Sequence, residues 1–578
     1  MSDFRLVMSF IGKRWKPIAV GAIFVVITNM FQVVIPSIVG KAVDLLRNSF
    51  TMRDLFRICA LILGIQALQG MSRFSMRYII IGASWRIEND VRLKIYNHLL
   101  KLPLSYYNKS RTGDIIARIT NDLTAVRMMI GPAIMYTINA CILAPAVLFF
   151  MFAKDAELAL LGVITFPFIA LTIYKVGKNI HREFKKVQES YSDISAHVQE
   201  NLNGIRLIKA YVREQFELDS LRTLSLAYVN NNRRVIKLQS FFHPILDLLA
   251  SAGVIIVLWV GGKKVAAGQT TLGTLVSLIM YLGLLVWPAI AFGWVVAIFQ
   301  RGTASARRIN EIFEEEPERQ DDGSDTRPLG GAITVRDLHF SYSDNNETLN
   351  SVSFDVKPGG TLAVVGRTGS GKTTLLSLLS GAYDVGRGKI YYDGIDINDL
   401  SLTRLRSSIS LVPQETFLFS ETVAENIAFG NEGAESDRIR RAAFLAAIDD
   451  EIASYPDGYE TVLGERGLTV SGGQRQRIAI ARALISDSPI LFFDDCLSNV
   501  DTVTEMKILK NIKNVIKNKT AIIVTHRLGA VTDADEILYM KNGIIIERGT
   551  HDKLLVLDGE YAALYHEQES IDLLEQQN

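Results

Sequence analysis

The sequence is poor in cysteine, with only Cys59, Cys141 and Cys496 among its 578 residues, and no two of them form a CxxC pair. This scarcity argues against a disulfide framework or a zinc site and favours a reducing environment. A strong charge of one sign is also lacking: the formal net charge is +1, so the composition indicates no nucleic-acid partner. The N-terminus shows no short apolar segment with a cleavage site, so we expect no removable signal peptide.

Apolar residues, by contrast, are abundant, at 48% of the chain with a mean hydropathy of +0.19. Long apolar stretches recur before about residue 300, and each is close to the ~20 residues that cross a ~30 Å hydrocarbon core as a helix. We therefore predict an all-α membrane domain of six spanning helices rather than the buried helices of a soluble domain. The predicted spans are 18–39, 56–81, 132–152, 158–176, 241–262 and 272–299.

Lysine and arginine are concentrated in two long loops, one after the second span and one after the fourth. Positive residues favour the cytoplasmic side of a membrane, so we expect these loops and both chain ends in the cytoplasm. We expect the membrane to be the inner (plasma) membrane of the cell. Apolar positions at helical spacing predict that the spanning helices continue beyond the bilayer. We interpret residues 106–114 and 203–206 as coupling loops that dock on a cytosolic domain; solvated loops are the alternative.

A charged segment broken by proline and glycine follows the last span and is typical of a linker. Beyond it, strand-like runs at 362–365, 409–412, 490–493 and 521–524 alternate with helical segments, which predicts an α/β domain with a largely parallel sheet. We predict a membrane domain over residues 1–310, a linker over 311–330 and an α/β domain over 331–578.

The segment Gly366–Thr373 reads GRTGSGKT, a full match to the GxxxxGK[ST] phosphate-binding loop, between a predicted strand and a predicted helix at 374–379. Its glycines allow backbone N–H groups to converge on phosphate oxygens at a helix N-terminus. Lys372 supplies a positive charge, and the Thr373 hydroxyl can ligate Mg²⁺. The expected nucleotide-binding residues are Gly366, Arg367, Thr368, Gly369, Ser370, Gly371, Lys372, Thr373 and Thr374.

Two further patterns lie downstream. The apolar run 490–493 ends in Asp494, a carboxylate placed to hold Mg²⁺. Before it, Ser471-Gly472-Gly473-Gln474 forms a turn at the head of a helix, which is a second anion site. One nucleotide does not need two phosphate cradles from the same domain, so this second cradle is expected to serve a nucleotide held by another chain.

The order of these motifs resembles an ATP-binding cassette (ABC), and the six-span half in front resembles that of ABC exporters, with one half-transporter in each chain. The resemblance implies P-loop NTPase chemistry with ATP and Mg²⁺, and a dimer of two such chains. Its residues carry over to this chain as follows: Tyr342 stacks on adenine, Gln414 contacts Mg²⁺, Ser471–Gln474 bind the partner's ATP, Ser498 and Asp501 form the D-loop, and His526 is the switch histidine.

The chain departs from the family pattern at Asp495, where the usual residue is a catalytic glutamate. The shorter side chain withdraws the carboxylate by about 1.5 Å, and a ~1 Å misplacement can cost about 10²-fold in rate. The signature Ser471–Gln474 is intact. This asymmetry favours one subunit of a heterodimeric multidrug-type exporter, in which this chain has the degenerate ATP site. A homodimer with slow hydrolysis at two such sites is the alternative.

Two other classes of protein are alternatives to an exporter. An importer would keep its membrane and ATPase parts on separate chains, whereas a regulatory membrane ATPase that gates a partner is compatible with Asp495. The expected cargo of an exporter is a small hydrophobic or amphipathic molecule, drug-like or lipid-like, whose identity the sequence leaves open. Candidate cavity residues are Asp247, which is charged within a span, and the aromatic Trp287 and Trp294; helix packing or lipid contact is the alternative for each.

Overall fold

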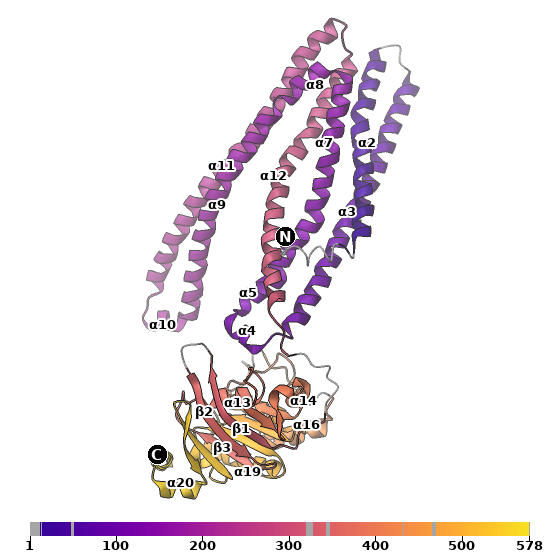
Figure 1. Ribbon diagram of the computed structural model, residues 1–578. Helices are drawn as coiled ribbons and strands as arrows, with labels where there is room; N and C mark the ends of the chain where they lie inside the picture. Colours follow the sequence, from indigo (N-terminus) through magenta and orange to yellow (C-terminus); the bar gives the residue numbers. More distant parts are fainter. Residues whose placement is uncertain are drawn as a thin grey trace. The chain divides into compact units, whose positions relative to one another are not determined.

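A computed structural model describes residues 12, 14–47, 51–319, 327–342, 347–431, 433–464, 467 and 470–576 (Figure 1). Part of the predicted linker, residues 320–326, lies outside the described residues. The chain divides into two units. The first contains residues up to Leu100 together with Ser110–Glu316, and the second contains Lys101–Lys109 together with the residues from Pro317 onward.

The first unit is helical, and six of its described helical stretches are long and apolar enough to cross a membrane, which confirms the predicted six spans. Several helices run far beyond the apolar stretches, as predicted: α3 continues to Leu99, and α12 enters the range predicted as linker. The main helices are α2 (Trp15–Arg47), α3 (Met52–Leu99), α7 (Ile134–Lys154), α8 (Ala156–Val163), α9 (Phe166–Asn203), α11 (Glu214–Ala266) and α12 (Leu272–Glu314).

Helices α9 and α11 pack along each other and are joined at one end by α10 (Ile205–Ala210), while α2 packs against both α3 and α12 (Figure 1). The third of the six spanning stretches begins with four short helical segments that lead into α7. These are α5 (Thr112–Ala117), η2 (Arg118–Asp122), α6 (Leu123–Met128) and η3 (Met129–Ala133). The two η segments are π-helical, and Pro132 lies in the second, where its missing N–H interrupts the regular ladder.

Polar contacts join the long helices and set their positions along one another, which apolar packing alone does little to specify. Within the apolar part, the Thr28 hydroxyl donates to Ser72 Oγ at 2.9 Å, which joins α2 to α3. The Tyr281 hydroxyl of α12 donates to the carbonyl of Val33 at 2.8 Å. Where the helices extend beyond their apolar part, the buried Glu88 carboxylate pairs with Arg127 at 2.7 Å. A buried charge that keeps its partner holds one packing arrangement, so these contacts fix which helix faces meet.

The second unit is an α/β domain built on a six-stranded sheet of order β10-β9-β3-β8-β7-β6 and a four-stranded sheet of order β2-β1-β4-β5. The predicted strands are confirmed, each to within a residue or two. The strands of the larger sheet are β3 (Thr361–Val365), β6 (Ile409–Val412), β7 (Ile490–Asp494), β8 (Thr520–Thr525), β9 (Glu536–Lys541) and β10 (Ile544–Gly549). The smaller sheet contains β1 (Ile333–Ser341), β2 (Glu347–Val356), β4 (Ile390–Tyr392) and β5 (Ile395–Asp396).

Strands β3, β8, β7 and β6 are neighbours and run parallel, so their C-terminal ends meet along one edge. They are almost wholly apolar because helices cover them. Leucines of α13 (Lys372–Leu379) share a core with Phe492, and Ile478 of α18 (Gly472–Leu484) shares another with Phe493. Ligands bind at the carboxyl ends of such strands, and the loops that follow these four carry the predicted nucleotide residues.

The short helix α4 (Leu104–Lys109) belongs to the second unit although the residues around it belong to the first. The Asn108 side chain donates to the Tyr383 hydroxyl at 2.5 Å, and Glu318 N donates to the carbonyl of Lys101 at 2.7 Å. The first predicted coupling loop therefore contains a short helix fastened to the α/β domain.

Candidate functional site

The phosphate-binding loop wraps the N-terminus of α13, as predicted. Gly366, Gly369 and Gly371 all have positive φ, and a Cβ on Gly366 would lie 2.2 Å from the carbonyl oxygen of Met540. Glycine is therefore required there by both conformation and space. The Lys372 ammonium folds back over the loop and donates to the carbonyl oxygens of Gly366 at 2.8 Å and Arg367 at 3.0 Å. A bound phosphate would replace these contacts.

One cavity of about 240 Å³ collects predicted residues from all four parallel strands. The Thr373 hydroxyl donates to Asp494 Oδ1 at 3.1 Å, which places the P-loop hydroxyl beside the strand-end carboxylate. Asp495 Oδ1 lies 2.7 Å from His526 Nδ1. The residues that line the cavity are Thr348, Thr368–Thr374, Gln414, Asp494, Asp495, Val524 and His526, of which Thr348 and Val524 were not among the predicted site residues.

Asp495 has a positive φ of 45°, a conformation that few side chains adopt and that aspartate tolerates better than most. Its N–H continues the sheet ladder by donating to the carbonyl of Val524 at 2.8 Å. The backbone at this position is therefore held by the neighbouring strand, and the carboxylate is held by the histidine that follows β8. Together these contacts aim the short carboxylate at the histidine of its own chain.

The signature segment lies elsewhere and contributes no residue to this cavity. Ser471 caps α18 and forms a reciprocal capping box with Gln474, in which each side chain oxygen accepts a hydrogen bond from the backbone N–H of the other residue. A Cβ on Gly473 would lie 2.8 Å from the carbonyl oxygen of Asn499, so the loop before Asp501 packs directly on the signature turn.

The loop that carries Ser498 is tied to the signature by Gln476, a residue that sequence analysis left without a role. Its side chain donates to Ser498 Oγ at 3.1 Å and accepts from Asn499 N at 3.0 Å. Asp501 caps α19 (Thr502–Ile516) by accepting from Thr504 N at 3.0 Å. The two segments predicted to reach a second nucleotide are thus one connected surface.

Tyr342 lies outside the cavity but beside it. It is 51% exposed, and its hydroxyl donates to Thr374 Oγ1 at 3.2 Å. Its ring meets the Tyr383 ring edge-on at 5.3 Å. An exposed aromatic ring next to a phosphate loop can stack on a base.

Comparison with known proteins agrees with this arrangement. The family model "ABC transporter transmembrane region" matches residues 18–289, and "ABC transporter" matches residues 349–498. A Bacillus subtilis protein named as the probable multidrug resistance ABC transporter ATP-binding/permease protein YheI is 36% identical over 97% of this chain and 96% of its own length. The chain belongs to the ABC exporter family.

Other relatives share the full architecture. The multidrug resistance-like ATP-binding protein MdlA of Escherichia coli is 36% identical over 97% of this chain and 95% of its own. An ATP-dependent lipid A-core flippase of Desulfotalea psychrophila is 33% identical over 91% of this chain and 92% of its own length. A solved bacterial Atm1-family ABC exporter with ATP bound aligns with a TM-score of 0.77 at 27% identity, covering 96% of this chain and 98% of that one. This chain is therefore an ATP-hydrolysing, multi-pass membrane half-transporter.

The electrostatics of the exporter's nucleotide cavity suit a metal ion with a polyphosphate. Burial raises the pKa of Asp494 to about 6, and the negative charge of Asp495 contributes to the rise. The hydrogen bond from Thr373 opposes it. Burial lowers the pKa of Lys372, and the hydrogen bond to Asp495 raises the pKa of His526. Two adjacent carboxylates facing one cavity repel each other, and a cation relieves that repulsion.

The donor set fits Mg²⁺. Thr373 supplies a hydroxyl, Asp494 a carboxylate and Gln414 an amide oxygen, all hard oxygen ligands that line one cavity. Mg²⁺ keeps several water ligands and takes others from phosphate, so a cage made only of protein side chains is not needed. When bound, the ion would neutralise phosphate charge.

The substrate candidates lie in the membrane unit. Trp287 lines a cavity between α2, α3, α7 and α12, and Trp294 meets the Tyr136 ring edge-on at 5.2 Å. Asp247 is exposed on α11 and lines neither this cavity nor the larger one beside α3. The structure therefore brings the two tryptophans together around Tyr136 and leaves Asp247 apart from them.

Proposed function

We propose that this chain is one subunit of a heterodimeric exporter of the cytoplasmic membrane that moves small hydrophobic or amphipathic molecules outward. In this proposal the cassette and both chain ends lie in the cytoplasm, as the basic loops favour. Relatives named for multidrug resistance and for lipid A-core flipping support a cargo of this kind. The observation that carries the proposal is the combination of Asp495 with a complete Ser471–Gln474 signature.

The division of labour follows from these two features. ATP at this chain's own site would be held by Lys372 and the P-loop, with Tyr342 against the base, and hydrolysed slowly because the Asp495 carboxylate is short and aimed at His526. The capped N-terminus of α18 would close on the ATP of the partner, whose own site would do most of the hydrolysis. Each nucleotide can shift the transporter between its states only by its differential affinity for them.

The export function is tested with inside-out vesicles that contain the chain with the subunit it co-purifies with. ATP is expected to drive accumulation of a neutral hydrophobic dye, and chelation of Mg²⁺ with EDTA is expected to stop it, because hydrolysis needs the metal that Thr373 and Asp494 are built to hold. A matched vesicle with Lys372→Ala controls for passive partitioning of the dye. ATP hydrolysis without any ATP-driven accumulation of tested cargo would favour the regulatory ATPase instead.

Tyr383 is expected to couple cargo binding to ATP hydrolysis. This side chain accepts from Asn108 of α4 and contacts Tyr342 beside the P-loop, so it joins the nucleotide side of the cassette to the short helix that belongs to the coupling loop. Tyr383→Leu is expected to lower cargo-stimulated ATP hydrolysis at least about fivefold and to leave basal hydrolysis within about twofold, since it breaks a link and spares the catalytic groups.

Tyr391→Leu is the matched control, because Tyr391 is a tyrosine of the same domain that lies in strand β4 and contacts Arg336 instead of α4. Both rates are measured on the same proteoliposome preparation, with and without cargo. Equal losses of basal and stimulated hydrolysis in Tyr383→Leu would show that Tyr383 is only structural.

A further inference from the structure

Two arginines of α3, Arg73 and Arg77, lie at membrane depth. Their level is set by Ser72, which accepts the Thr28 hydroxyl at 2.9 Å. Thr28 is near the middle of the spanning stretch Trp15–Leu46, about 20 Å from its first residue and about 27 Å from its last at 1.5 Å per residue. Arg73 follows Ser72 directly, and Arg77 is one helical turn further along, so both belong to the apolar part of the helix.

Both arginines are exposed, and neither makes an ion pair with any residue that the structure describes. Three carboxylates of the same unit are engaged with other cations. Asp90 pairs with Arg14 at 2.8 Å, Glu88 with Arg127 at 2.7 Å, and Asp155 with Lys264 at 3.1 Å. A cation at membrane depth without a carboxylate partner is costly, and such residues face a watery cavity or a ligand.

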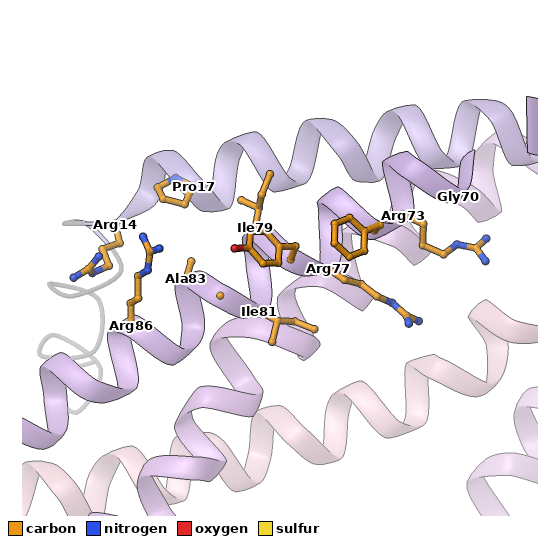
Figure 2. Close-up of a pocket in the computed structure, with 12 residues that line it drawn as sticks. Arg14, Pro17, Gly70, Arg73, Arg77, Ile79, Ile81, Ala83 and Arg86 are labelled. Carbon is orange, nitrogen blue, oxygen red and sulfur yellow. The ribbon is translucent and has the colours of Figure 1, made fainter. Parts of the chain in front are cut away.

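The two arginines stand between two cavities and line both. The first, of about 300 Å³, is formed by α2, α3, α7 and α12 and presents polar groups of Gln32 and Asn139 together with the ring of Trp287. The second, of about 700 Å³, runs along α3 past Phe74 and Ile81. Figure 2 shows Arg73 and Arg77 extending to the same side of the second cavity, away from Arg14 and Arg86 at its other end.

We propose that Arg73 and Arg77 form a subsite for the anionic group of an amphiphilic organic anion, which the exporter carries as cargo. The inference rests on the proposed export function and narrows its substrate class. Two guanidinium groups one turn apart can share one sulfonate, phosphate or carboxylate through charge-assisted hydrogen bonds. The apolar cavity beside them accommodates the hydrocarbon part, and Trp287 offers an aromatic wall to the head-group side.

The test uses two fluorescent probes that differ only in charge. 1-Anilinonaphthalene-8-sulfonate carries one sulfonate, and N-phenyl-1-naphthylamine is the same phenyl–naphthyl amine without it. Transport is measured as ATP-driven uptake into inside-out proteoliposomes of phosphatidylcholine, so that no anionic lipid competes. The exporter is purified through a tag on this chain and keeps the subunit with which it assembles. Binding of each probe is measured on the same preparation by equilibrium fluorescence titration.

The double variant Arg73→Gln/Arg77→Gln is expected to raise the KM and the Kd for the sulfonate at least about tenfold and to change those for the neutral amine less than about twofold, because only the sulfonate uses the charge. Arg73→Lys/Arg77→Lys, which keeps both charges, should recover most of the lost affinity. Arg53→Gln, on the same helix but outside both cavities, is the control and should affect neither probe.

Three results would overturn the assignment. In the first, the glutamine variant loses affinity for both probes equally, so that the arginines act through packing. In the second, it leaves both unchanged. In the third, it dissociates the two subunits or abolishes basal hydrolysis, so that the arginines pair with carboxylates of the other subunit. Failure of the export function itself looks different: neither probe is accumulated with ATP, while the fluorescence titration still decides the subsite.

Discussion

Replacement of Ser471 by alanine is expected to lower the kcat of ATP hydrolysis by the assembled transporter about 10²-fold, the effect of removing a preorganised donor from a charged transition state. Ser471 stands at the N-terminus of α18 in a capping box with Gln474, and the adjacent Gly473 is packed against Asn499. In the proposed heterodimer this turn completes the competent site on the partner's ATP. Its loss therefore removes most of the hydrolysis, although it lies outside this chain's own nucleotide cavity.

The matched change at this chain's own site should have little effect. Asp495→Asn is expected to lower the kcat of the same assembled transporter less than about twofold, because a site already slowed by a misplaced carboxylate contributes little to the total rate. A homodimer predicts the reverse: every active site would then contain Asp495, and the asparagine variant would be as inactive as the Ser471 variant.

A separate control removes the effect of helix capping. Ser401 caps α14 (Leu402–Ser407) by accepting from Arg404 N at 3.0 Å, and it lines neither the nucleotide cavity nor the signature turn. Ser401→Ala should lower the free energy of unfolding by ~1 kcal/mol, as the loss of the Ser471 cap would, and leave kcat unchanged. A similar loss of activity in Ser401→Ala would show that the Ser471 variant fails through helix destabilisation and not through phosphate contact.

The second large effect is a gain. Asp495→Glu in the purified chain alone is expected to raise kcat by up to about 10²-fold, because the added methylene advances the carboxylate by about 1.5 Å toward the phosphate side of the cavity. Two copies of this chain would each supply an intact signature, so the short carboxylate is the remaining defect of the site. The advance also releases the carboxylate from its 2.7 Å contact with His526.

The rate is measured as phosphate release at saturating ATP, with Asp535→Glu as the matched control. Asp535 directly precedes strand β9 of the same sheet and accepts from Thr361 N at 2.8 Å, but it does not line the nucleotide cavity. An unchanged rate in Asp495→Glu, with ATP still bound, would mean that a feature other than carboxylate length makes this site slow.

The sequence predicted the parts of this protein that depend on local pattern. The apolar runs were long enough to identify six spans, and the loop at Gly366–Thr373 was correctly placed between a strand and a helix. Parallel strands bring their C-terminal ends together, and the structure accordingly places Asp494 at the end of β7 and His526 just after β8 in one cavity.

The contacts that depend on tertiary packing could not be predicted in this way. Asn108 and Tyr383 are 275 residues apart, and neither carries a motif that points to the other. Gln568, in the C-terminal helix α21 (Glu560–Gln576), accepts from Leu528 N at 2.9 Å, two residues after His526, again without a sequence signal. Arg73 and Arg77 were visible as charges inside an apolar run, but their place beside two cavities depends on how α3 packs against its neighbours.

The most direct test of the account is ATP hydrolysis by this chain alone compared with hydrolysis by the same chain purified with the subunit it assembles with in its native membrane. The two are assayed at equal cassette concentration and saturating Mg²⁺-ATP. A heterodimer with a degenerate site predicts that the chain alone is at least about tenfold slower, as expected for a misplaced catalytic carboxylate. Equal rates would contradict the account and assign full activity to the Asp495 site.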